Sequence, residues 1–162
     1  MIGNHRITNF MSEDHDRLEA IFKQFQHSKK IDPNLSNKLF YDFKIGLQRH
    51  IVWEEEILFN YLENKKKALK SSASNSNPIA LLRMHHTQIK DYLDKIHKKL
   101  EDMDMNTDQL ESWLIELLNE HNIQEEDIVY PWIDEELSER DIEEAFYRMK
   151  NLPKEKYNKC CE

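Results

Sequence analysis

The sequence has few residues that interrupt helices. Its 162 residues include only two glycines and four prolines, whereas leucine, isoleucine, glutamate and lysine are plentiful. It also contains no long run in which apolar and polar residues alternate, as they do in a half-buried β-strand. Together, these features predict an all-α fold. A chain of this length can bury one core of ordinary size, so we expect a single folded domain.

Cysteines, long apolar segments and an excess of positive charge are missing as well. The only cysteines are the adjacent Cys160 and Cys161, which are too few and too close together to cross-link a fold. No apolar run approaches the roughly 18 residues of a membrane span, and the N-terminal residues lack the apolar segment of a signal peptide. The net charge of −8 repels phosphate groups and anionic lipid. We therefore expect a cytoplasmic protein with neither nucleic acid nor membrane as a partner.

The most informative feature that is present is an internal repeat. The segment HIVWEEEILFNYLE at residues 50–63 recurs 71 residues later as HNIQEEDIVYPWID at residues 121–134. The same offset carries His15 onto His86. Each half of the chain therefore supplies one single histidine and one His-x-x-x-Glu pair. This pattern suggests a duplicated unit whose halves coordinate a shared ligand.

Apolar residues at three- and four-residue spacing predict the helices. They are expected from about residue 8 or 12 to 27, from 36 to 66, from Pro78 to about 100, from Asn106 or Thr107 to a kink or end at Pro131, and from 139 to 150. A turn is expected at residues 28–35, a linker at 67–78 and a flexible tail at 153–162. The predicted architecture is an up-down-up-down four-helix bundle built from two helical-hairpin repeats, plus a short C-terminal helix.

The two hairpins are expected to bring their histidines to the same height. In an antiparallel hairpin, residues equidistant from the turn lie at one level, because both arms rise equally per residue. The midpoint between His15 and His50 is 32.5, and the midpoint between His86 and His121 is 103.5. Both midpoints fall within expected turns. The four histidines can therefore meet in one layer of the core.

Two of these histidines are followed four residues later by a glutamate, at Glu54 and Glu125. Residues four apart share one face of an α-helix, so each pair points into the same space. Buried imidazole and carboxylate groups are costly without partners, and a bound metal ion removes that cost. The mixture of nitrogen and oxygen donors does not suit Mg²⁺ or Ca²⁺, and the lack of ligating cysteine disfavours iron–sulfur clusters and structural zinc. Iron, manganese and zinc remain.

Two ions suit six such side chains better than one. The two carboxylates can each bridge a pair of ions while the histidines bind them from either side, as in di-iron carboxylate bundles. Two octahedral ions need roughly twelve ligand atoms, of which the protein supplies about eight and a shared oxygen about two. About two positions then stay open. Open positions on a redox metal suit O₂, NO or peroxide.

The order and spacing of the motifs over residues 12–134 resemble those of the hemerythrin-like HHE cation-binding family. The resemblance rests on the segments DHDRL, HIVWEEEILF, HHTQI and HNIQEEDIVYP. It implies a hemerythrin-like domain over residues 1–152 and a non-haem di-iron centre of two iron ions with a bridging oxo or hydroxo group, with manganese or zinc as alternatives. The metal ligands that it implies are His15, His50, Glu54, His86, His121 and Glu125.

Departures from the classical oxygen carriers of this family bear on function. Those proteins have a fifth histidine one turn from the histidine of the third helix, where this chain has Leu82 and Lys90, and an aspartate after the fourth-helix histidine. The second His-x-x-x-Glu pair, with Glu125, is more similar to iron–sulfur-cluster repair proteins linked to nitrosative stress. The resemblance thus implies a carrier, store or sensor of O₂ or a related ligand. An iron-donating or NO- or peroxide-processing repair protein is the alternative, and a metal-stabilised scaffold is a third interpretation.

Polar residues near these six have more ordinary interpretations. His85 is expected to orient a ligand, with direct metal binding as the alternative, and Glu19 is expected at the surface. Glu55 and Glu126 are expected on a solvent-exposed acidic face, with ligand orientation as the alternative. No residue is assigned a catalytic role.

Overall fold

The computed structural model describes residues 5–68 and 77–159 of the chain. These residues form helices, and within the described ranges they contain no strand. The all-α prediction is confirmed. In chain order the elements are α1 (Arg6–Ser28), α2 (Pro33–Val52), the π-helix η1 (Trp53–Leu58), α3 (Phe59–Ala68), α4 (Pro78–Glu101), α5 (Asp108–Gln124), the π-helix η2 (Glu125–Val129), α6 (Tyr130–Glu136), α7 (Glu139–Lys150) and the 3₁₀-helix η3 (Lys154–Lys156).

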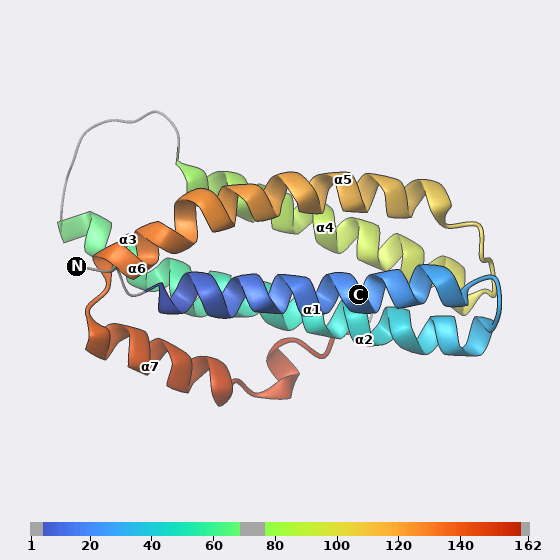
Figure 1. The fold of residues 1–162 in the computed structure, drawn as a ribbon, viewed down its shortest axis with the longest axis horizontal. Helices are drawn as coiled ribbons and strands as arrows, with labels where there is room; N and C mark the ends of the chain where they lie inside the picture. Colours follow the sequence, from blue (N-terminus) through green and yellow to red (C-terminus); the bar gives the residue numbers. More distant parts are fainter. Residues whose placement is uncertain (1–4, 69–76, 160–162) are drawn as a thin grey trace.

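Long helical rods lie side by side in a bundle (Figure 1). The segments α2, η1 and α3 follow one another without a break, and so do α5, η2 and α6. In Figure 1, α1 and α4 run one way along the long axis, and α2 and α5 run back beside them. The helix α1 packs along α2, α4 packs along α5, and α2 also contacts α4. Two helical hairpins are thus joined into one bundle.

Polar side chains cap the helices where the chain turns. Asp32, Asn77 and Ser138 each accept hydrogen bonds from backbone N–H groups in the first turn of α2, α4 and α7. Both α2 and α4 also have a proline in the first turn. Backbone N–H groups there make no hydrogen bond within the helix, so the lack of an N–H in proline breaks none. The predicted turn at residues 28–35 was therefore too long, because Pro33 already belongs to α2.

The rod that contains α5 continues past Pro131. This proline lies in the first turn of α6, directly after η2, and α6 extends to Glu136. Asp134 in the same helix accepts hydrogen bonds from the backbone N–H groups of Ile7 and Thr8, at 2.8 and 2.9 Å. Its carboxylate thereby caps the start of α1 from the far end of the chain.

The apolar core is divided into two clusters along the bundle. On α1, Ile7 and Met11 belong to one cluster, and Leu18, Phe22 and Phe25 belong to the other. On α4, Ile79 and Leu82 precede the polar pair His85–His86, and Ile89 and Leu93 follow it. The polar layer between the two clusters contains His15 and His86, so it is the part of the core that needs explanation.

Close packing of α1 on α2 depends on Gly46. A Cβ atom at this position would lie 2.7 Å from Cδ2 of Leu18, which is closer than side-chain atoms approach one another. Gly46 stands one turn before His50, and Leu18 stands one turn after His15. A side chain at position 46 would therefore displace the Leu18 methyl group near the level where these two histidines meet.

The C-terminal segment lies against the bundle. Helix α7 buries Ile142, Ala145 and Met149 in the first apolar cluster. After it, the hydroxyl of Tyr41 donates a hydrogen bond to Asn158 at 3.0 Å. Residues 69–76 of the predicted linker, and Cys160 and Cys161, lie outside the described residues. No helix in the described ranges is long and apolar enough to span a membrane.

Candidate metal centre

The four histidines singled out by the repeat meet in one layer. The rings of His15 on α1 and His50 on α2 have centroids 4.6 Å apart. The rings of His86 on α4 and His121 on α5 have centroids 4.8 Å apart. All four side chains are buried. The expectation that each hairpin brings its two histidines level therefore agrees with the geometry.

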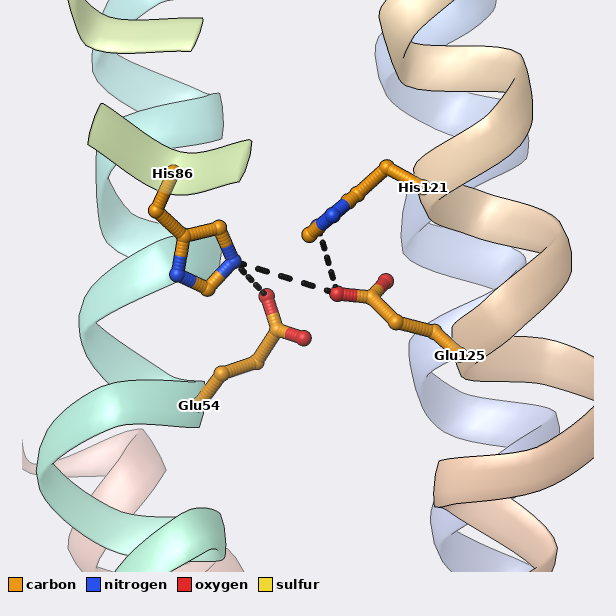
Figure 2. Close-up of side chains that lie close together, drawn as sticks. All are labelled: Glu54, His86, His121 and Glu125. Carbon is orange, nitrogen blue, oxygen red and sulfur yellow. Dashed lines mark ion pairs between the residues drawn. The ribbon is translucent and has the colours of Figure 1, made fainter. Parts of the chain in front are cut away.

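One group of potential metal ligands lies between the two hairpins (Figure 2). Single donor atoms of Glu54, His86, His121 and Glu125 all lie within 4.8 Å of one another. Nε2 of His121 is 2.6 Å from Oε1 of Glu125, and Nε2 of His86 is 3.5 Å from Oε1 of Glu54. Figure 2 shows all four side chains pointing toward the same space. These donors can surround one ion.

A second group overlaps the first. Donor atoms of His15, His50 and Glu125 also lie within 4.8 Å of one another. Nε2 of His15 is 3.1 Å from Oε2 of Glu125, whereas Oε1 of Glu125 faces His121. Oε1 of Glu54 is 3.5 Å from Nε2 of His50 and also 3.5 Å from Nε2 of His86. Both carboxylates thus contact both groups, which is the arrangement of bridging ligands.

Both glutamates lie where the helix changes its hydrogen-bond register. Glu54 is the second residue of η1, and Glu125 is the first residue of η2. The backbone N–H of Phe59 donates to the carbonyl of Glu54, and that of Tyr130 donates to the carbonyl of Glu125. These hydrogen bonds span five residues, as in a π-helix, and π-helical turns frequently occur at functional sites. The two halves share this feature at the same offset of 71 residues, and the residue pattern gave no sign of it.

Each of the four histidines has a polar partner at Nδ1. His50 donates to Asp14 at 2.8 Å, His15 to Glu126 at 3.0 Å and His86 to Glu55 at 3.1 Å. Nδ1 of His121 lies 3.3 Å from Nδ1 of His85. With Nδ1 engaged, Nε2 is the ring nitrogen that each histidine directs to the centre, as in histidines that bind metals.

These partners decide several open points from the sequence. His85 belongs to neither group of converging donors and contacts His121, so it has the orienting position. Of the two interpretations of Glu55 and Glu126, the contacts support ligand orientation rather than a solvent-exposed acidic face, because each carboxylate reaches a buried histidine on another helix. Glu19 is exposed and pairs with Lys23 at 2.9 Å. The sequence gave no role to Asp14, although the 71-residue offset relates it to His85, which was expected to orient a ligand.

Tyr130 is the other residue that sequence reasoning missed. Its side chain is fully buried, and its hydroxyl donates to Oε2 of Glu125 at 2.7 Å. The hydroxyl oxygen also lies 3.2 Å from Oε2 of Glu54. In the sequence this residue stands out only as part of a Tyr-Pro motif ending, and its π-helical position explains why it faces Glu125.

Three buried polar atoms of the centre lack a partner in hydrogen-bond geometry. They are Oε1 of Glu54, Nε2 of His86 and Oε1 of Glu125, whose neighbours among the described residues are ion-pair contacts only. Leaving such groups unpaired costs about 1–3 kcal/mol each, and more for charged groups. A cation in contact with all three atoms removes this cost. The donor set therefore fits a metal ion.

In the metal-free protein, protons bound to some of these side chains reduce the cost of burying them. Burial and the charge of Glu125 raise the pKa of Glu54 well above its usual value. Burial acts to raise the pKa of Glu125 too, but the charge of His121 and hydrogen bonds from neighbouring groups hold it well below the usual value. Burial lowers the pKa of His86, yet hydrogen bonds to the carboxylates around it, led by Glu125, raise that pKa well above the usual value. Metal binding must displace these protons.

A cavity of about 130 Å³ borders the centre at His15. It lies between α1 and α5, with Phe43 and Leu47 of α2 also in its wall. Apolar side chains such as Leu118 and polar side chains such as Glu19 both line it. Its size suits a molecule of a few atoms.

Comparison with known proteins identifies the family. The model of the hemerythrin HHE cation-binding domain matches residues 6–133, which include all six residues named above as ligand candidates. No curated protein and no solved structure gives a significant match to the chain. The resemblance drawn from the motifs is confirmed. The chain belongs to the hemerythrin HHE cation-binding domain family.

Proposed function

We propose that the chain binds two iron ions in this centre and, through them, a small ligand such as O₂, NO or peroxide. The observation that carries the proposal is the pair of overlapping donor groups, in which Glu125 belongs to both and Glu54 contacts both. Two ions held by shared carboxylates use all of these donors at once. Manganese or zinc is the alternative occupant.

The proposed ligands are the six residues that the sequence singles out. His15 and His50 hold one ion, His86 and His121 hold the other, and Glu54 and Glu125 bridge them. Iron in such a site supplies redox chemistry and coordination positions for the small ligand. The residues around it keep the histidines oriented through Nδ1, and the apolar clusters on both sides keep bulk water out.

The cavity beside His15 supports a role that involves a small, weakly polar molecule. Its size and the apolar part of its wall, which includes Leu118, suit a molecule such as O₂ or NO. A carrier, store or sensor needs such access, and a scaffold does not. We therefore place reversible ligand binding first among the functions considered.

Metal analysis is the first test. Protein purified from iron-supplied cells is expected to contain two iron ions per chain, and the variant Glu54→Ala/Glu125→Ala is expected to contain almost none. Two zinc ions and no spectral response to any gas would instead support a metal-stabilised scaffold.

The second test separates binding from consumption. The metal-free protein is loaded with Fe(II) without oxygen, and visible spectra are recorded on addition of O₂, NO or peroxide and again after the gas is removed. A spectrum that returns to its starting form supports a carrier, store or sensor. Catalytic turnover or rapid irreversible oxidation would support the alternative, an NO- or peroxide-processing or iron-donating repair protein, which the second His-x-x-x-Glu pair with Glu125 favours.

We also propose that the helical rods form the up-down-up-down four-helix bundle of the family, with residues 1–152 as the domain and the residues that follow as a separable C-terminal segment. The alternating directions of α1, α2, α4 and α5 support this arrangement (Figure 1). Limited proteolysis that removes residues 153–162 before it cuts any long helix is the expected result.

A further inference from the structure

The Tyr130 hydroxyl lies among the candidate ligands of the centre. Its oxygen lies 2.7 Å from Glu125, 3.2 Å from Glu54, 3.1 Å from Nε2 of His50 and 3.4 Å from Nε2 of His15. A phenol has one proton to donate, and the shortest of these contacts is the one to Glu125. The phenol oxygen therefore faces four candidate ligand side chains at once.

The spacing matches that of ligands around one metal ion. Bonds of about 2.1 Å in octahedral geometry place adjacent ligand atoms about 3 Å apart. The Tyr130 oxygen lies near that distance from the donor atoms of His15, His50 and Glu125. That group has three members, whereas the group around His86 and His121 has four. Tyr130 adds a donor to the smaller group, beside the contact that Glu54 makes with His50.

We propose that Tyr130 is a metal ligand, which binds through its phenolic oxygen the ion held by His15, His50 and Glu125. When a ferric ion binds, the O–H bond breaks, the proton passes to solvent, and the electron pair left on oxygen forms the bond to the metal. The positive charge of the ions stabilises the phenolate where two carboxylates alone would oppose it. This inference rests on the proposed metal binding and adds a ligand to it.

The helix geometry delivers this oxygen to the centre. In an α-helix, residues five apart point about 140° away from one another. In η2 the N–H of Tyr130 donates to the carbonyl of Glu125, so the two residues stand one π-helical turn apart on the same face. Ligation by Tyr130 therefore depends on the π-helical register.

The related position in the first half lacks this oxygen. The 71-residue offset carries Phe59 onto Tyr130, and Phe59 has the same hydrogen bond, to Glu54. Its ring stacks on His86 with centroids 6.1 Å apart and planes 5° apart. One ion is thus bounded by a phenol oxygen and the other by an apolar ring. The duplication has given rise to two unequal metal positions.

The proposal is tested in the diferric protein by its colour. Phenolate bound to Fe(III) absorbs visible light, and excitation in that band enhances the ring vibrations of the tyrosine. The wild-type protein and the variants Tyr130→Phe and Tyr92→Phe are loaded with iron, oxidised, and examined by visible absorption and resonance Raman spectroscopy. Iron content and thermal unfolding are measured on the same samples.

The expected result is a phenolate band with enhanced ring modes in the wild type and in Tyr92→Phe, and loss of both signals in Tyr130→Phe with at least half of the iron retained. Tyr92 is the control because its ring packs against Trp113, away from the centre. A wild-type protein that holds two ferric ions without these ring modes would overturn the ligand assignment while leaving the metal site intact. A chain that holds no iron would overturn the proposed function itself, so the two failures are distinguishable.

Discussion

Oδ2 of Asp14 lies 2.8 Å from Nδ1 of His50, and both side chains are buried. The other carboxylate oxygen accepts a hydrogen bond from Nε of Arg17 at 2.9 Å. Asp14 is thus fixed on α1 and fixes in turn a histidine on α2. The ring of His50 has one orientation in which Nδ1 keeps this bond and Nε2 faces the centre.

Removal of Asp14 is expected to weaken metal binding without removing a ligand. Partners of metal-bound histidines typically contribute 10- to 100-fold to affinity, so Asp14→Ala is expected to raise the dissociation constant by about that factor. Competition with a chromophoric chelator measures the change. The exposed neighbour Asp16 provides the control, and Asp16→Ala is expected to bind as the wild type does.

Replacement of each of three consecutive glutamates is expected to reduce metal binding to a different extent, most at Glu54 and least at Glu56. Glu54→Ala removes a carboxylate that we propose to bridge the two ions, and the variant is expected to lose most bound metal. Glu55→Ala removes only the Nδ1 partner of His86 and is expected to weaken binding by about 10- to 100-fold. Glu56 is exposed, so Glu56→Ala is expected to change nothing. Equal metal content in all three variants would contradict the assignment of Glu54 as a bridge.

The stability of the metal-free protein is expected to fall as pH rises above about 6.5. The pKa of His86 is raised in the folded state, so protonated His86 stabilises the fold below the unfolded pKa of about 6.5, and this contribution is lost as pH rises through the folded pKa. His50, whose pKa burial lowers, acts in the opposite direction but only below that range.

Metal loading is expected to remove this pH dependence, because the ion replaces the proton on Nε2 of His86. Thermal unfolding of metal-free and metal-loaded protein between about pH 6.5 and 8.5 tests both statements. Glu55→Gln is expected to make the metal-free dependence shallower, since Glu55 is one of the carboxylates that raise the pKa of His86. A metal-free protein that becomes more stable over this interval would contradict the assignment.

Filling the cavity beside His15 is expected to slow ligand entry. Leu118 lines the cavity, so Leu118→Phe places additional atoms in it without touching a proposed ligand. The association rate of NO with the Fe(II) protein, followed by stopped-flow absorption, is expected to fall several-fold with iron content unchanged. Leu117 is partly buried but does not line the cavity, and Leu117→Phe is the matched control.

An ion pair far from the centre is expected to contribute to the free energy of unfolding and not to metal binding. Nζ of Lys29 at the end of α1 pairs with Glu111 on α5, and both side chains are buried. Lys29→Met leaves the Glu111 carboxylate without its cation, which is expected to cost about 3–5 kcal/mol in the free energy of unfolding. Urea unfolding of the metal-free protein measures this loss. Lys30→Met, at an exposed neighbouring position, is expected to cost less than about 0.5 kcal/mol.

The sequence alone was sufficient to place the six ligand candidates in one layer, because the relevant geometry is periodic. Hairpin symmetry places His15 level with His50, and four-residue spacing aligns His50 with Glu54. Helix ranges followed from the same periodicity to within a few residues, with two exceptions. Asp32 caps α2, which begins earlier than expected with a proline, and the rod that contains α5 continues past Pro131 to Glu136.

The remaining parts of the centre depend on relations that periodicity does not contain. Asp14 reaches His50 across the contact between two helices, at a distance that Gly46 permits. Glu55 follows the proposed ligand Glu54 directly, and the sequence left both a solvent-exposed and a ligand-orienting role open; its contact with His86 on α4 depends on how the helices pack. Tyr130 faces Glu125 only because η2 is wider than an α-helix, and no residue pattern signals that change.

The π-helical segments also limit how this bundle can be redesigned. A version of the chain with ideal, uninterrupted α-helices would omit one residue from each rod, and every side chain beyond that point would turn by about 100° relative to the side chains before it. Such a protein can still bury an apolar stripe and remain a stable bundle. It would present a different face of α6 to the centre, and Tyr130 would point away from Glu125. A test of folding alone would not detect this change.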